Sequence, residues 1–264
     1  MDTNLFPKNG KGKNEETPWL EPAGASANLS HPETIPSGNS GSNRPSLFVT
    51  STKAVWLAGS LALLALWGAF LADRNVLDFV HAHARGWSLQ VARQISIWGD
   101  WYGVAVVGLL GWWQAKRRKS EYWKRLLLVM GVCAAFSGLG ANVIRSMSGR
   151  ARPHSGAAAG WYGPFAKHHP LRSAHAFQSF PSAHTSVVAG FCAPMGWVAL
   201  RSRRRRALWI FLPLSLSATA LMGWSRVWVG AHHLSDVLAA ALLGWSIALG
   251  WLHYRVSDLS APPR

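Results

Sequence analysis

Acidic residues are scarce in this sequence, which has 11 Asp and Glu but 27 Lys and Arg among its 264 residues. No cluster of carboxylates is available to hold a metal ion, which excludes the usual metal-assisted hydrolases. The net charge of +16 would suit nucleic acid, an anionic membrane surface or an acidic substrate. The basic residues are grouped between long uncharged runs, a pattern typical of membrane proteins rather than of nucleic-acid-binding proteins.

Cysteine is also rare, and the two examples, Cys133 and Cys192, both lie in apolar runs. Two such residues provide neither a disulfide framework nor the ligand spacing of a metal site. We therefore expect each to be a buried free thiol, and we expect no metal and no other cofactor.

The first 52 residues lack apolar periodicity and are rich in Pro, Ser, Gly, Asn and Thr. This composition predicts a disordered polar tail. The opening stretch, MDTNLFPKNGKGKNEE, has no apolar core, so we expect no cleaved signal peptide.

Long uncharged runs are, in contrast, abundant. A membrane-spanning helix needs about 20 residues, with about 17 to 25 typical. Six stretches approach this length, some only when their polar ends are included: 54–72, 95–115, 126–144, 184–200, 207–225 and 237–252. The sequence predicts an all-α polytopic membrane protein with six transmembrane helices over residues 53–256, followed by a short tail at 257–264.

The stretch NVLDFVHAHARGWSLQVARQ separates the first two predicted spans. Val76, Val80, His83, Trp87 and Val91 recur there at helical spacing, which predicts a short amphipathic helix on the membrane surface. A metal site at its histidines is an alternative, but lone histidines on such helices are more often simply tolerated.

Two basic loops predict the orientation. KRRKSEYWKR (116–125) has six basic residues and RSRRRR (201–206) has five. With six helices both loops lie on the same side, and the positive-inside rule makes that side cytoplasmic, together with both termini. We expect an integral protein of a bacterial inner membrane. This reading of the clusters as topology signals is favoured over nucleic-acid or lipid binding.

The segments 145–184 and 225–236 then face the periplasm or cell exterior. The first of them nevertheless carries several basic residues, against the positive-inside rule: Arg145, Arg150, Arg152, Lys167 and Arg172. An anionic substrate is the simplest reason for positive charge on that side.

Three polar clusters lie at the outer ends of the predicted helices: RSMSGRARP, SFPSAHT and SRVWVGAHHLSD. Arg145, Arg152 and Arg226 offer planar groups of donors that match phosphate oxygens. The segment Pro181–His184 is typical of a helix start, where free N–H groups and the Ser182 hydroxyl favour an anion.

His232 and Asp236 are four residues apart, so on a helix they share one face. A carboxylate bonded to one ring nitrogen makes the other a better nucleophile, and His184 could protonate the leaving oxygen. Alone, a His-x-x-x-Asp pair is usually a structural hydrogen bond and an interfacial Arg usually snorkels. All three clusters on one membrane face together predict metal-free phosphoryl transfer through a phosphohistidine.

In their order and spacing these motifs resemble the type 2 phosphatidic acid phosphatase (PAP2) superfamily, whose pattern is Lys-x6-Arg-Pro, Pro-Ser-Gly-His and Ser-Arg-x5-His-x3-Asp. The resemblance covers residues 54–252 and implies a PAP2 or acid-phosphatase-like helical bundle without a metal requirement. It implies that His232 is the nucleophile, Asp236 its partner and His184 the general acid. It further implies that the phosphate is held by Arg145, Arg152, Ser182, Ala183 and Arg226.

Two positions depart from the family pattern. Arg145 stands where the family usually has Lys, which keeps the charge on a bulkier group. Ala183 stands where the family usually has Gly; its N–H is retained, but its methyl group could crowd the phosphate.

The predicted function is a membrane phosphatase acting on a lipid phosphate or diphosphate. The lipid could be phosphatidate, phosphatidylglycerol phosphate, a polyprenyl diphosphate or a phosphorylated saccharolipid. The alternatives are a lipid phosphotransferase and, in another class, a transporter or flippase with an anion-binding vestibule. A transporter would be expected to have charged or broken-helix positions near the bilayer midplane, whereas these spans are uncharged there. The sequence leaves the oligomeric state open.

Overall fold

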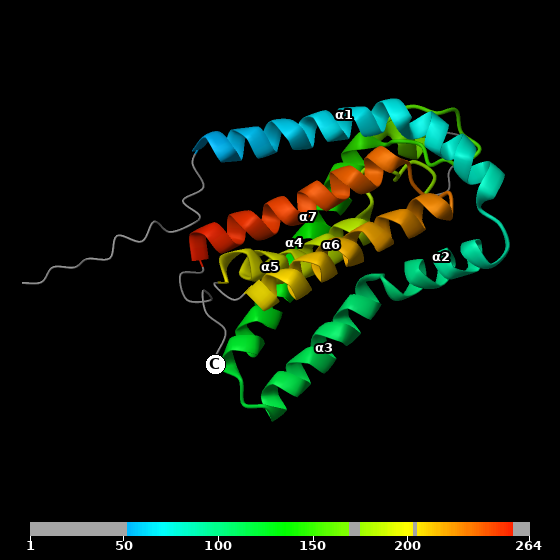
Figure 1. Cartoon of the computed structure of the whole chain (residues 1–264). Helices are drawn as coiled ribbons and strands as arrows, with labels where there is room; N and C mark the ends of the chain where they lie inside the picture. Colours follow the sequence, from blue (N-terminus) through cyan, green and yellow to red (C-terminus); the bar gives the residue numbers. More distant parts are fainter. Residues whose placement is uncertain (1–51, 169–174, 203–204, 256–264) are drawn as a thin grey trace, which may run out of the picture. The chain divides into compact units, whose positions relative to one another are not determined.

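The structure, a computed structural model, describes residues 52–168, 175–202 and 205–255. Apart from Thr52, the tails predicted at 1–52 and 257–264 lie outside these ranges, as does Arg172 of the outer basic set. The described residues form α1 (Thr52–His83), α2 (Gly86–Trp98), α3 (Trp101–Arg117), α4 (Glu121–Ser148), the 3₁₀-helix η1 (Gly163–His168), α5 (Ala183–Arg201), α6 (Arg205–Trp228) and α7 (Leu234–Arg255) (Figure 1). The predicted all-α fold is confirmed.

Among the described residues, five helices are long and apolar enough to cross a membrane, namely α1, α4, α5, α6 and α7. Their surfaces expose large apolar side chains such as Trp56, Leu63 and Trp67, which are 73%, 69% and 63% exposed. A continuous apolar surface of this kind belongs in lipid rather than in water. The chain is therefore an integral membrane protein.

The predicted span 95–115 is divided in the structure. Residues 95–98 belong to α2, whose end is closed by the Gly99 N–H donating to the Ile95 carbonyl over 2.8 Å. Asp100 then caps α3, because its Oδ1 accepts the Trp101 N–H over 2.7 Å. The remaining helix α3 has 17 residues, or about 25 Å at 1.5 Å per residue, against about 30 Å of hydrocarbon. A sixth span therefore stays a prediction.

The surface helix predicted across residues 75–94 is wrong as a single element. Its first part continues α1 to His83, and the chain turns at Gly86, whose φ of +57° favours glycine. Val80 of α1 packs against Val227 and Val237, and this contact extends α1 past the end of its uncharged run. The second part forms α2.

Helix α5 lies at the centre of the bundle and packs against α4, α6 and α7. Small residues allow this close packing. A Cβ at Gly190 would lie 2.7 Å from the Cys133 carbonyl oxygen, and one at Gly244 would lie 2.6 Å from the Ala189 side chain. The bundle brings the end of α4, the start of α5 and the start of α7 together. The Ser148 hydroxyl donates to the Phe180 carbonyl over 2.7 Å, and the Ser182 N–H donates to the Asp236 carbonyl over 3.1 Å.

Candidate active site

The N-terminus of α5 presents main-chain N–H groups that can bind an anion. Ser182 occupies the N-cap position, but its side chain does not cap the helix and instead accepts a hydrogen bond from the Thr185 hydroxyl over 3.1 Å. The first N–H groups of a helix have no partner within the helix. Those of α5 begin at Ala183, so the predicted helix start is found and the Ala183 N–H is preserved.

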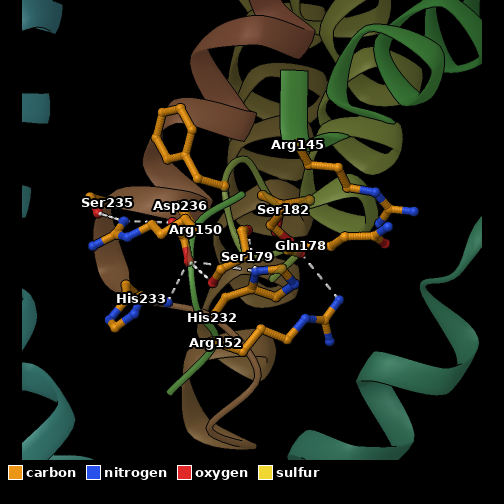
Figure 2. Close-up of polar contacts among 12 residues, drawn as sticks. Arg145, Arg150, Arg152, Gln178, Ser179, Ser182, His232, His233, Ser235 and Asp236 are labelled. Carbon is orange, nitrogen blue, oxygen red and sulfur yellow. Dashed lines mark hydrogen bonds and ion pairs between the residues drawn. The ribbon is translucent and has the colours of Figure 1, made fainter. Parts of the chain in front are cut away.

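His232 lies just before α7 and is 2% exposed. Its Nδ1 is 2.7 Å from the Ser179 carbonyl oxygen and 3.6 Å from Asp236 Oδ2 (Figure 2). The first distance is a hydrogen bond and the second is too long for one. A carbonyl only accepts, so Nδ1 carries the proton and Nε2 keeps its lone pair. The main chain at Ser179, and not Asp236, therefore directly orients His232.

Burial lowers the pKa of His232 to about 4, although Asp236 raises it, and the positive charges of Arg226 and Arg152 lower it further. A ring with this pKa is neutral at pH 7. The nitrogen predicted to attack phosphorus is therefore unprotonated under ordinary conditions.

Asp236 is completely buried and fully engaged. Its Oδ1 pairs with Arg150 Nη1 at 2.6 Å, and its Oδ2 accepts from the Ser179 hydroxyl at 2.5 Å and from the His233 N–H at 2.8 Å. Asp236 and His232 thus lie beside one another at a distance longer than a hydrogen bond, while these three donors hold the carboxylate. Asp236 instead fixes the two segments that flank the His232 ring.

The three predicted phosphate-binding arginines come from different elements. Arg145 lies in the last turn of α4, Arg152 lies in the loop after it, and Arg226 lies near the end of α6. The nearest partner of Arg152 Nη2 is the Gln178 carbonyl at 3.4 Å, and Arg226 contacts the Ser96 hydroxyl. The Nε atoms of Arg152 and Arg226 are buried, and within the described residues neither has a hydrogen-bond partner.

His184 lies in the first turn of α5, and its Nε2 is 3.4 Å from Asp100 Oδ1. It interacts electrostatically with Arg226, Arg152 and Arg145. Charged groups from four parts of the chain therefore lie around this second histidine.

An apolar groove of about 870 Å³ between α3, α4 and α5 reaches this cluster. Trp101, Leu109, Leu128, Leu139 and Phe191 line its length, and Asp100, Arg145, Ala183 and His184 also border it. A smaller cavity of about 420 Å³ shares Asp100 and His184 with the groove and adds Ser96 and Arg226. A molecule with a long apolar part and an anionic end fits such a pair of spaces.

Sequence reasoning missed several residues of the cluster. Asp73, the first charge after the uncharged run 54–72, and Asp100, which interrupts an apolar run, were visible as charges near membrane depth. Arg150 was noted only as part of the outer basic set. Ser179 gave no signal, because its contact with His232 uses a main-chain carbonyl.

Comparison with known proteins identifies the class. The family model of the PAP2 superfamily matches residues 126–258. A crystal structure of a transmembrane PAP2 type phosphatidylglycerolphosphate phosphatase from Bacillus subtilis superposes with a TM-score of 0.53 at 17% identity, covering 78% of this chain and 98% of that one. At this identity the likeness shows a shared fold.

Two curated relatives add detail. The chain is 38% identical over 119 residues to a lipid A 1-phosphatase of Rhizobium etli, covering 44% of this chain and 42% of the relative. It is 36% identical over 101 residues to the undecaprenyl-diphosphatase BcrC of Bacillus subtilis, covering 38% of this chain and 47% of that protein. The matched regions thus span less than half of each relative. On the family match, this chain belongs to the PAP2 superfamily.

Proposed function

We propose that this protein is a lipid phosphate phosphatase that works through a phosphohistidine on His232. One observation carries the proposal: a buried, neutral imidazole with a free Nε2 lies among arginines whose buried Nε–H groups have no partner in the described chain. Buried donors without partners are rare in folded proteins. An anionic group held beside the ring would satisfy them.

In the first half-reaction, His232 Nε2 attacks phosphorus and the bond from phosphorus to the lipid oxygen breaks. His184, paired with Asp100, gives its proton to the departing oxygen. In the second half-reaction, His184 takes a proton from water, whose oxygen attacks phosphorus and breaks the P–N bond. Inorganic phosphate leaves, and both histidines return to their starting states.

The phosphate oxygens bind to Arg145, Arg152 and Arg226 and to the start of α5 at Ser182 and Ala183. Guanidinium groups and helix N–H groups are strong anion donors, particularly where water is excluded. They stabilise the negative charge that is spread over the equatorial oxygens of the five-coordinate phosphorus. Arg145 retains the charge of the family's usual Lys but supplies a planar group of donors.

The lipid tail lies in the apolar groove between α3, α4 and α5, whose border includes Arg145 and His184. The groove favours a lipid over a soluble sugar phosphate, because long apolar chains gain most from its lining. The names of the two curated relatives make a phosphorylated saccharolipid and an isoprenoid diphosphate the first substrates to test.

The site opens at the outer face of a bacterial inner membrane. Helices α4 and α5 run antiparallel, because Ser148 at the end of α4 donates a hydrogen bond to the carbonyl of Phe180, three residues before α5 begins. The basic loops at 116–125 and 201–206 therefore share a side, which the positive-inside rule makes cytoplasmic. With α3 as a sixth span, both termini are cytoplasmic.

The proposal is tested with purified full-length protein in detergent, assayed for released phosphate against a panel of lipid A, undecaprenyl diphosphate, phosphatidylglycerol phosphate and phosphatidate. We expect release that persists in EDTA and is inhibited by vanadate, which mimics five-coordinate phosphorus. Transfer of phosphate to a second lipid without free phosphate would show a phosphotransferase. No release from any lipid, or loss in EDTA that Mg²⁺ or Zn²⁺ restores, would contradict the proposal.

A further inference from the structure

A buried ion-pair network joins α1 to the candidate site. Arg150 Nη2 is 2.7 Å from Asp73 Oδ2 on α1, and Arg150 Nη1 is 2.6 Å from Asp236 Oδ1 on α7. Asp73 and Arg150 are each 8% exposed and Asp236 is 0% exposed. The three charges therefore lie in a low-dielectric environment, where the strength of their interactions depends strongly on the distances between them.

Ser235 completes the network. Its N–H donates to Asp73 Oδ1 over 2.9 Å, and its hydroxyl donates to Asp73 Oδ2 over 2.6 Å and accepts from Arg150 Nη1 over 2.7 Å. Asp73 thus receives three donors, two of them from the first turn of α7. In Figure 2, Arg150 lies beside Ser235 and Asp236, whereas Arg145 and Arg152 lie on the other side of His232.

The network decides how Asp236 is held. Because Arg150 occupies Oδ1, only Oδ2 is left for the Ser179 hydroxyl and the His233 N–H. These two contacts fix the segments before and after the His232 ring. Arg150, paired with two carboxylates, also differs from Arg152 and Arg226, whose Nε atoms have no partner among the described residues.

We propose that Asp73 is a positioning residue for the reaction. It acts through Arg150 on Asp236, and through Asp236 on the orientation of the His232 ring. The inference rests on the proposed function. Asp73 lies outside residues 126–258, where the family model matches, and outside the three motifs RSMSGRARP, SFPSAHT and SRVWVGAHHLSD. In this chain α1 supplies a charge on which the geometry of the site depends.

An Asp73→Asn substitution is nearly isosteric but removes one of the two carboxylates that Arg150 pairs with. The guanidinium then shifts toward its remaining partner, and the Asp236 carboxylate turns with it. Its contacts to Ser179 and His233 lengthen, and the His232 ring loses its fixed orientation. A misplacement of about 1 Å can cost on the order of a hundredfold in rate.

The test compares phosphate release by purified full-length wild type, Asp73→Asn and Asp78→Asn on the lipid that the wild type hydrolyses. Asp78 lies on the same helix and is exposed, so it is the matched control. We expect a fall in kcat of roughly tenfold to a hundredfold for Asp73→Asn, a KM close to that of the wild type because Asp73 does not touch substrate, and wild-type rates for Asp78→Asn.

A double-mutant cycle separates positioning from general loss of structure. If Asp73 acts through Asp236, then adding Asp73→Asn to Asp236→Asn costs little more, since one pathway is already broken. Losses that multiply fully in the double variant would overturn the proposal. So would an Asp73→Asn rate equal to that of Asp78→Asn.

Folding is checked by size-exclusion chromatography and thermal unfolding of each variant. If Asp73→Asn does not fold, Asp73→Glu takes its place, because it keeps the charge and displaces it by one methylene. We then expect reduced kcat with unchanged KM, and full activity would refute the positioning role. A wild type that releases no phosphate would refute the proposed function itself. An active wild type together with a fully active Asp73→Asn variant would refute only the positioning role of Asp73.

Discussion

Lowering the pH tests the ionisation of His232 directly. Its pKa falls from an ordinary 6.5 to about 4, chiefly because the ring is buried. The difference corresponds to about 3 kcal/mol against the charged form, since one pKa unit is about 1.4 kcal/mol. At pH 5.5 an ordinary imidazole would be only about one-tenth neutral, whereas His232 would be nearly all neutral. We therefore expect the acid limb of kcat/KM, which reports the free enzyme, to lie well below pH 6.5.

The measurement uses initial rates at low substrate concentration from pH 4.5 to 8. A phosphate monoester has its own pKa of about 6, so the ionisation of the lipid is followed by ³¹P NMR in the same micelles and divided out. A corrected kcat/KM that drops about tenfold between pH 7 and 5.5 would refute the assignment of a neutral, buried nucleophile. In Asp236→Asn the limb should move further down, because Asp236 raises the pKa of His232.

The same ionisation has a consequence for stability. The unfolded chain binds a proton on His232 below about pH 6.5, whereas the folded chain does so only near pH 4. This residue therefore lowers the free energy of unfolding as pH falls through that window, and contributes no further change below it. Each rate sample is for this reason returned to pH 7 and assayed again, so that reversible protonation is distinguished from unfolding.

Three further predictions follow from the site and its surroundings. His232→Ala should abolish nearly all turnover, and Asp236→Asn should reduce turnover less. The two losses should not multiply in the double variant, because the two residues act as a unit; losses that multiply fully in phosphate-release assays would contradict this. In a background lacking Cys133 and Cys192, a membrane-impermeant thiol reagent on intact cells should label Ala158→Cys and spare Ser202→Cys, and labelling only at 202 would invert the topology. Gly131→Phe should raise KM for long-chain lipids but not for a short-chain phosphate, since Gly131 borders the groove with open space beside it; Gly59→Phe on α1, also in open space, is the control, and equal effects of both would refute the tail site.

The helices were the predictable part of the fold. Uncharged runs marked α1, α4, α5, α6 and α7, because chains in lipid must satisfy their main-chain polar groups internally. The predicted helix boundaries were wrong at two places. In one, the apolar run continues across the end of a helix; in the other, the apolar run ends before the helix does. Gly99 and Asp100 divide an otherwise apolar run, and α1 passes its first charges to end at His83. Local capping and tertiary packing decide such boundaries, and apolar patterning reports neither.

The candidate site was predictable as a set of residue types but not as a set of contacts. Spacing placed His232 and Asp236 on one face and suggested a direct bond between them. In the structure, the His232 ring is hydrogen-bonded to the Ser179 carbonyl. The Asp236 carboxylate accepts hydrogen bonds from Arg150, from the Ser179 hydroxyl and from the His233 N–H. A main-chain acceptor has no sequence signature. A long-range partner such as Arg150 emerges only when the loop after α4 folds back against α7.

The charges of the cluster define which phosphate it would prefer. Arg150 is balanced by Asp73 and Asp236, and Asp100 lies beside His184. Among the described residues, Arg145, Arg152 and Arg226 form no ion pair with a carboxylate, and uncompensated charge in a partly buried site is costly. A monoester or terminal diphosphate brings about two negative charges at neutral pH, whereas a diester brings one and adds a second bulky substituent. If the chain hydrolyses a lipid phosphate as proposed, we therefore expect this surplus of positive charge to discriminate against the phosphodiester lipids that form the surrounding membrane.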